Sequence, residues 1–583
     1  MDNPSPVLTT PVLRIGVTGH RSFADEASVR QALEPLLAEL SAMAARVHAQ
    51  LVAISPLAEG ADRLVAEEAL ALGARLEAPL PFTRDEYEQD FETAESKQAF
   101  RRLLAQAGAI YELDGRREDA DAAYEAVGRV VLAHSDILIA LWDGLPGRGR
   151  GGTAQIVAEA LAAGVAVVRV DAAGKEDPKV LGAVGAASEP ASLEAQVIAL
   201  LTPPSPPPHA LRRAEPSLQA LAAETQPAWT LGWVFDLVRD LMLGRLRAPK
   251  MMFGNWMQAS LASWTAELEV LPPEAGRRLI ETLRPSYTWA DELATYYAGL
   301  YRSGSLGCWL LSAASVMFAL AGDINSRFEG AFLLLELLSI AALLLLLWRA
   351  HVGCWHERWV QYRQLAEQLR PMRFLFPLDV RLPRPPGSGM ELESGQRTSW
   401  IDWLSRQVER GLGLPSVAVG PDTLERTRRL VRTELQGQQR YQTENAKRLT
   451  AVEHRLRLFG ELLFVVVLIA CVAHMALWWA AHRLGQESTG NVEGLLRFVA
   501  GGLPALGAAF FGIRSLGEFA RLSHRSQAMA EALAGLCRRL DELKDEALTR
   551  TGLARAAEET AALMMSETAD WRTIVILKPL ELP

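Results

Sequence analysis

Three short loops near the start of the chain carry glycine, arginine and carboxylate residues that together can bind a phosphorylated ligand. Glycines that open a helix let backbone N–H groups approach a phosphate, and the helix N-terminus favours its negative charge. Arg21 can add a fork of charged donors, while Glu59 and Asp62 can accept hydrogen bonds from ribose hydroxyls or a base. The loops are 18–21, 59–63 and 149–153. The predicted nucleotide-binding residues are Thr18, Gly19, His20, Arg21, Glu59, Gly60, Asp62, Arg63, Gly151, Gly152 and Thr153.

The elements that must position these loops are short apolar runs separated by helical patterns. Any single loop could be an ordinary turn between a strand and a helix, so the hypothesis depends on all three meeting at one end of a sheet. Apolar runs without alternation, spaced by helices, are typical of a parallel sheet covered on both faces. We therefore predict a doubly wound α/β domain over residues 12–201, which binds ligands at the carboxyl ends of its strands. The runs are 13–17, 51–55, 76–80, 109–113, 136–142 and 165–170, and helices are expected over 85–107, 121–134 and 153–163 among others.

Composition restricts the class of protein. Of the 583 residues, 49% are hydrophobic, which is high for a purely soluble chain of this size and indicates membrane-embedded segments. The net charge of −9 argues against a nucleic-acid partner, which would require a basic surface. The four cysteines are scattered, so neither a zinc site nor a disulfide framework is expected. No GxxxxGK[ST] sequence is present, so a P-loop is not supported.

Four apolar stretches in the C-terminal half approach the roughly 20 residues that span a bilayer. They cover about 305–322, 330–348, 459–480 and 495–513. Burial inside a soluble core would be tenable for one such stretch but not for four. Basic residues flank the stretches on one side, and the first residues lack the features of a secretory signal. We therefore expect two transmembrane hairpins, with both termini in the cytoplasm.

The remaining chain divides between linkers and helices. The sequence TPPSPPPH opens a proline-rich linker over 202–227, which separates the α/β domain from a cytoplasmic helical region. The predicted segments after the linker are 228–304 (cytoplasmic helices), 305–370 (first hairpin plus a cytoplasmic helix), 371–420 (irregular connection), 421–570 (long helix, second hairpin and cytoplasmic helix) and 571–583 (extended).

Two apolar seams predict that the membrane helices continue into the cytoplasm. Leucines and other apolar residues recur there at spacings of three and four, which is typical of packed helices. Either an intramolecular hairpin or a coiled coil between protomers would satisfy this pattern, and the latter would make the protein a homo-oligomer. Inside the predicted spans, Glu336 and His474 are ionisable and are therefore functional candidates. The seams consist of Leu449, Val452, Leu456 and Phe459, and of Leu533, Leu536, Leu540, Leu543 and Ala547.

Motifs in the N-terminal domain resemble the SLOG superfamily, which includes DprA-like and LOG-like Rossmannoid nucleotide-binding proteins. They are IGVTGHR (15–21), LAEGADRLVAEEAL (57–70), LPFTRDEYEQDF (80–91), DILIALWDG (136–144) and RGGTAQIVAEA (150–160). The C-terminal half resembles the SLATT family of SMODS- and SLOG-associating two-transmembrane effectors, as in CWHERWVQYRQLAEQLR (354–370). The resemblance implies a bacterial conflict, stress or antiviral-defence protein. Its Rossmann-like domain would sense a nucleotide-derived signal, and its helices would form a pore or otherwise perturb the membrane.

One departure from the family favours binding over catalysis. Catalytic LOG-type proteins, which hydrolyse nucleotide N-glycosidic bonds, carry a glutamate three residues after the threonine of their glycine-rich motif. Here that position is Ile156, and Glu159 lies a further three residues along, so no catalytic residue is assigned. The alternative functions are a membrane-anchored nucleotide-processing enzyme and a structural scaffold whose domain is degenerate. No metal or cofactor other than a nucleotide-type ligand is expected.

Overall fold

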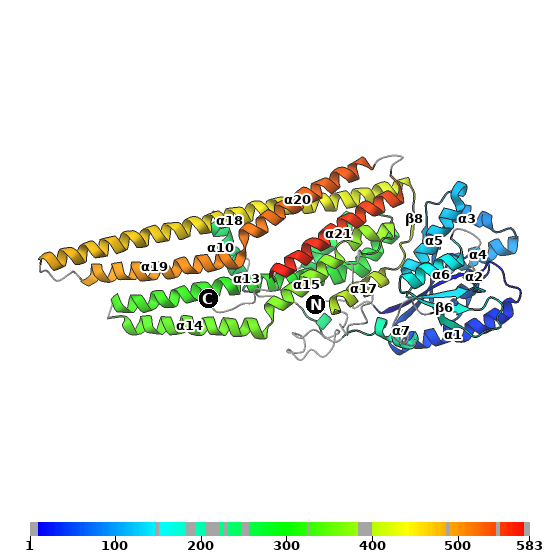
Figure 1. Ribbon diagram of the computed structural model, residues 1–583, viewed down its shortest axis with the longest axis horizontal. Coiled ribbons are helices and arrows are strands. Elements are labelled where there is room, and N and C mark those ends of the chain that lie inside the picture. The colour runs from blue at the N-terminus through cyan, green and yellow to red at the C-terminus, as the bar shows by residue number, and fades with distance from the viewer. Residues whose placement is uncertain are drawn as a thin grey trace.

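The computed structural model shows an α/β domain at one end of a long bundle of helices (Figure 1). The helices extend away from the sheet, and the longest of them run roughly side by side along the molecule. The structure describes residues 10–145, 151–181, 193–204, 221–225, 230–245, 256–324, 327–382, 399–484, 490–543 and 548–575.

The sheet has eight strands in the order β7-β6-β5-β1-β2-β3-β4-β8. All neighbouring pairs are parallel except the edge strand β7, which runs antiparallel to β6. The prediction of a parallel-dominated α/β sheet is therefore confirmed, with one antiparallel edge. The strands are β1 (Val12–Gly19), β2 (Gln50–Ile54), β3 (Arg75–Leu80), β4 (Ala107–Glu112), β5 (Ile137–Leu141), β6 (Ala166–Val170), β7 (Lys179–Leu181) and β8 (Val417–Ala418).

Helices cover both faces, which explains why the strands are apolar throughout. Every residue of β5 is buried, because α5 and α6 pack on one face and α1, α2, α4 and α7 on the other. The expected helix over 85–107 is broken into two, and the second begins at a Thr93 side chain that accepts a hydrogen bond from Ser96 N. The helices are α1 (Glu26–Arg46), α2 (Ala61–Ala71), α3 (Arg84–Tyr87), α4 (Ala94–Gln106), α5 (Ala120–His134), α6 (Thr153–Ala162) and α7 (Leu193–Leu201).

The direction of the strand order reverses at β1. The chain passes from β1 through β2 and β3 to β4 on one side, and then α5 carries it back to β5 on the other side of β1. In sheets of this class, the reversal leaves a crevice beyond the carboxyl ends of the two strands, and ligands bind there. In this chain the crevice lies beyond Gly19 and Leu141, which end β1 and β5.

The C-terminal region is mostly helical. Four of its helices are long and apolar enough to cross a membrane, and they contain the four predicted stretches. Leu462, Leu468 and Phe511 are more than half exposed, so these apolar side chains lack cover within the single chain. The helices and short turns are α10 (Trp233–Met242), α11 (Trp256–Leu268), α12 (Pro273–Arg278), η3 (Leu279–Leu283), α13 (Arg284–Ile324), α14 (Glu329–Val352), α15 (Trp355–Leu369), α16 (Met372–Leu375), η4 (Phe376–Leu378), α17 (Trp400–Leu412), α18 (Pro421–Leu484), α19 (Gly490–Gly517), α20 (Phe519–Glu542) and α21 (Arg550–Val575).

The segment 371–420, expected to be irregular, contains α16, α17 and β8 among its described residues. Helix α17 buries Trp403, Leu404 and Val408 in the core that also contains β1 and β4 residues. Strand β8 then extends the sheet beyond β4, where Val417 pairs with Tyr111. The α/β domain is therefore completed by residues that lie about 300 positions later in the chain than their partners.

Most residues of the two apolar seams pack against other parts of the same chain. Leu533, Leu536 and Leu540 lie in the large core, and Val452 and Leu456 pack against Phe519 of α20. Hydrogen bonds reinforce this contact, since Thr450 Oγ1 lies 2.7 Å from Ser523 Oγ. Contacts within the chain therefore cover most of both seams, whereas Phe459 is exposed and Ala547 lies outside the described residues.

A fragment limited to residues 1–205 is expected to fold less stably than the same residues in the whole chain. It would lack β8 and would leave backbone groups of β4 unpaired, and a lost buried hydrogen bond costs about 1–3 kcal/mol. Amide exchange in β4 should therefore be about tenfold faster or more in the fragment. A fragment that carries residues 399–420 on a flexible linker should recover the slow exchange. Equal exchange in all three proteins would show that β8 contributes nothing.

Candidate functional site

The loops after β1 and β2 are packed tightly together at the carboxyl end of the sheet. His20 N donates to Leu141 O at 3.1 Å, and Ala61 N donates to His20 O at 3.0 Å. Gly60 has a φ of +80°, and a Cβ there would lie 2.4 Å from His20 O. Only glycine combines that backbone conformation with that close approach. The end of β1 and the following His20 are thus held against the N-terminus of α2.

The third loop reaches the same place through the N-terminus of α5. The guanidinium of Arg21 lies over the ring of Tyr124, 5.2 Å from its centroid. The next residue, Glu125, lies beside Gly151, where an added Cβ would be 3.0 Å from Glu125 N. Arg21 and Gly151 therefore contact two consecutive residues of α5, Tyr124 and Glu125. Loops 18–21 and 149–153 thus both reach the N-terminal part of α5, while Gly149 and Arg150 lie outside the described residues.

Helix α6 presents its N-terminus to this crevice. Gly152 is the N-cap residue and has no side chain with which to satisfy the first N–H groups of the helix. Gly151, with a φ of +76°, turns the chain into the helix, and its N–H donates to Gln155 Oε1 at 2.9 Å. Backbone donors and the positive end of the helix dipole make this a favourable place for an anion.

Two predicted ligand-binding residues, Glu59 and Arg63, instead contact other parts of the protein. Glu59 accepts a hydrogen bond from Ser96 Oγ, and Arg63 donates to Leu57 O at 3.1 Å. Arg63 also lies over the ring of Phe91, 4.3 Å from its centroid. These contacts fix the left-handed backbone at Leu57, whose φ is +63°. Glu59 and Arg63 therefore stabilise the conformation of the loop after β2.

Asp62 is buried beneath the crevice. Burial raises its pKa to about 7, although the Ala58 N–H and the charges of Arg21 and Arg63 act in the opposite direction. A carboxyl with this pKa exchanges its proton near neutral pH. The Asp62 carboxylate accepts a hydrogen bond from Ala58 N at 3.3 Å and thereby stabilises the loop after β2.

The Asp62→Asn variant is expected to be more stable than the wild type at pH 7.5 but not at pH 4.5. Because the folded pKa of Asp62 exceeds the unfolded value, the native state binds more protons and loses stability as the pH rises from about 4 to about 7. The difference should reach the order of 3 kcal/mol. This stability difference is measured from the thermal unfolding midpoints of both proteins at the two pH values in the same detergent. A difference that is the same at both pH values would contradict the assignment.

The sequence did not identify the aromatic and acidic groups that complete the crevice wall. Tyr124 donates to Asp90, and Asp90 also pairs with Arg117. Burial alone would lower the pKa of Arg21, but its hydrogen bond to Tyr124 and the nearby charges raise it overall. The motif at 80–91 contains Asp90, but Tyr124 has no local signal because it lies in an ordinary helical pattern.

The position of Glu159 does not suit catalysis. Arg129 donates to both of its carboxylate oxygens, at 3.0 and 2.9 Å, and lowers its pKa. Ile156, which occupies the place of the family's acid, is buried in the core. Within the described ranges, no three His, Cys, Asp or Glu side chains gather closely enough to hold a metal ion. The Glu159 carboxylate is therefore held by Arg129 on the surface of the domain.

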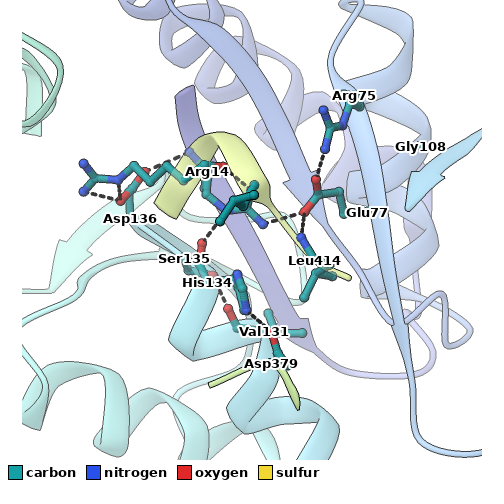
Figure 2. A network of polar contacts seen from close by, with 12 residues as sticks. Arg14, Arg75, Glu77, Gly108, Val131, His134, Ser135, Asp136, Asp379 and Leu414 are labelled. Carbon is teal, nitrogen blue, oxygen red and sulfur yellow. Dashed lines mark hydrogen bonds and ion pairs between the residues drawn. The ribbon is translucent and has the colours of Figure 1, made fainter. Parts of the chain in front are cut away.

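A buried polar network lies at the opposite, amino end of the strands and joins the sheet to α17 (Figure 2). Arg14 of β1 pairs with Glu77 of β3 at 2.5 Å, and both side chains are almost completely buried. Leu414 N donates to Glu77 at 3.0 Å, and Arg410 pairs with Asp136 at 2.9 Å. The chain after α17 is therefore fixed to the sheet by charged groups.

The two ionisable residues of the predicted spans are placed separately. Glu336 is half-buried on α14, and His474 is half-buried on α18. Neither belongs to the crevice, which lies in the α/β domain. Any function of Glu336 and His474 would therefore involve contacts within the helical region.

The sequence offers no relative from which a function could be transferred. Family membership, SLOG and SLATT included, therefore stays a prediction from the motifs quoted above. The site must be interpreted from its own geometry, because no protein-family model and no characterised protein matches this chain.

Proposed function

We propose that this protein is a membrane-embedded effector of a bacterial conflict or stress system that senses a nucleotide-derived signal and permeabilises the inner membrane. The observation that carries the proposal is the convergence of Arg21, the glycine-rich turn and the open N-terminus of α6 at the point where the strand order reverses. This arrangement suits a phosphate group.

The membrane part of the proposal rests on exposed apolar surface. Two hairpins, α13 with α14 and α18 with α19, would cross the bilayer, and α13 also packs against α19. Basic residues near the sheet-proximal ends of the spans, such as Arg349, Arg455 and Arg514, place that side in the cytoplasm under the positive-inside rule. With few spans in each chain, a pore would require several protomers.

Helix α18 offers a direct mechanical connection between the two parts. It begins at Pro421, three residues after β8 ends, and runs for 64 residues, or about 96 Å at 1.5 Å per residue. Helix α21 provides a second link, since Arg550 donates to Tyr111 Oη of β4 at 2.9 Å. Movement of β4 and β8 on ligand binding would therefore act on the base of a membrane helix. The ligand can shift that equilibrium only by its differential affinity for the two states.

The Arg21→Ala variant is expected to bind nucleotides about 10- to 100-fold more weakly, because it loses a charge-assisted contact worth about 1.5–3 kcal/mol. Titration calorimetry of the full chain in nanodiscs, with nucleoside monophosphates, diphosphates and dinucleotides, measures the change. The matched control is Arg46→Ala at the far end of the sheet, where Arg46 pairs with Glu194. Release of free base during the titration would favour the alternative, a membrane-anchored hydrolase. Absence of binding by the wild type to the whole panel would overturn the proposed sensor.

A further inference from the structure

Helix α10 (Trp233–Met242) runs across the bundle rather than along it. Its first turn is fixed to α13, where Phe235 N donates to Ser303 Oγ at 3.0 Å. Its last turn is fixed to α18, where Arg455 donates to Met242 O. Figure 1 shows α10 between these two long helices. A helix that connects two roughly parallel neighbours in this way lies crosswise to both of them.

The two attachment points lie at the same level of the bundle. Ser303 lies two residues before the apolar stretch 305–322, and Arg455 lies four residues before 459–480. Met242 also packs against the cluster of Val452, Leu456 and Phe519, which surrounds the base of the α18 span. Helix α10 is therefore located where the membrane-spanning part of the bundle would begin.

The bundle covers only part of the apolar side of α10, and the rest of that side is exposed. At 100° per residue, one sector carries Phe235 and Met242 and contacts the bundle. The adjacent sector carries Leu237 and Leu241, which are 39% and 56% exposed, and nearby Leu231 is 50% exposed. The remaining sector is charged, and Arg239 pairs there with Asp236 at 2.6 Å.

We infer that α10 is an interfacial helix, which lies in the plane of the cytoplasmic membrane surface and inserts Leu237 and Leu241 between the lipid headgroups and acyl chains. The inference rests on the proposed membrane insertion of α13 and α18. Three features favour lipid as the occupant: the crosswise orientation, the level of attachment and the continuity with the exposed apolar surface of the spans. A helix with an apolar and a charged side binds in this manner at a bilayer boundary. The sequence that follows adds Arg245, Arg247 and Lys250, which suit anionic headgroups.

Site-directed spin labelling of the full chain in lipid nanodiscs tests this placement. The label is attached to Leu241→Cys or to Asp236→Cys, which is on the charged sector of the same helix. Leu468→Cys, in the middle of the α18 stretch, reports on membrane insertion itself. The background carries Cys471→Ala, because Cys471 is exposed whereas Cys308, Cys354 and Cys537 are buried. Collision with oxygen, which partitions into lipid, is compared with collision with an aqueous nickel chelate.

The expected result is an oxygen-to-nickel ratio several-fold higher at 241 than at 236, with the highest ratio at 468. A low ratio at 241 with a high ratio at 468 would overturn the inference and leave membrane insertion intact. A low ratio at 468 would overturn both. Protection of 241 from both reagents would also overturn the inference, because protein, such as a second copy of the chain, would then cover the leucines.

Discussion

Replacing Arg14 by methionine is expected to lower the free energy of local unfolding of β1 and β3 by about 3–5 kcal/mol, because it removes the fully buried cation that pairs with the Glu77 carboxylate. Burial by itself would raise the pKa of Glu77, but Arg14, Arg75 and Arg278 outweigh it and hold the pKa at about 2. Glu77 is therefore ionised in the folded protein.

Hydrogen exchange of the β1 and β3 amides in the full chain measures this loss. The same substitution at exposed Arg46 is the control and should change exchange little. The double variant Arg14→Met, Glu77→Leu should lose less than the sum of the two single variants, since the two side chains interact directly. Unchanged exchange in Arg14→Met would show that the pair does not stabilise the sheet. Because the folded pKa of Glu77 is depressed, its contribution is present above about pH 4.5 and is lost as the pH falls towards 2.

Replacing Gly152 by aspartate is expected to abolish most nucleotide binding without harming the fold. Gly152 has a φ of −71° and a ψ of 162°, which any residue can adopt. Aspartate is also a good N-cap residue, so α6 should be as stable as before or more so. Its carboxylate would stand about 5 Å from a bound phosphate and repel it by about 3 kcal/mol at an effective dielectric constant of 20. The expected loss of affinity is about 100-fold.

The matched control is Gly152→Asn, which has the same shape and capping ability but no charge. Calorimetric titration of both variants with the nucleotide panel isolates the electrostatic part of the effect. Equal affinity of the aspartate and asparagine variants would place the phosphate away from α6. Loss of secondary structure in either variant would be detected by circular dichroism before titration.

Local sequence patterns were sufficient for much of the architecture. The run 136–142 is apolar throughout because β5 is buried on both faces, and the four long apolar stretches have no equivalent in a soluble core. Glycines 60 and 151 were informative because each has a positive φ and lies close to another loop. In these cases burial or backbone conformation constrains residues that are close together in the chain, so the constraint is visible in the sequence.

Contacts between distant segments could not be predicted in the same way. Strand β8 has two residues and pairs with a strand about 300 positions earlier, so no local pattern indicates it. Arg14 interrupts the apolar run LRIGV, and its partners come from β3 and from the last turn of α17. Glu59 and Arg63 have residue types that suit ligand binding, but Ser96 and Leu57 use them within the protein.

Leakage of dye-loaded vesicles by the full-length protein tests the central claim most directly. Wild type, Gly152→Asn and Gly152→Asp are reconstituted at equal density and exposed to the nucleoside monophosphates, diphosphates and dinucleotides of the binding panel. The account predicts that at least one nucleotide accelerates leakage through the wild type, less through the asparagine variant and least through the aspartate variant. Leakage that is equal in all three proteins, with and without every nucleotide, would contradict a membrane effector controlled through this crevice.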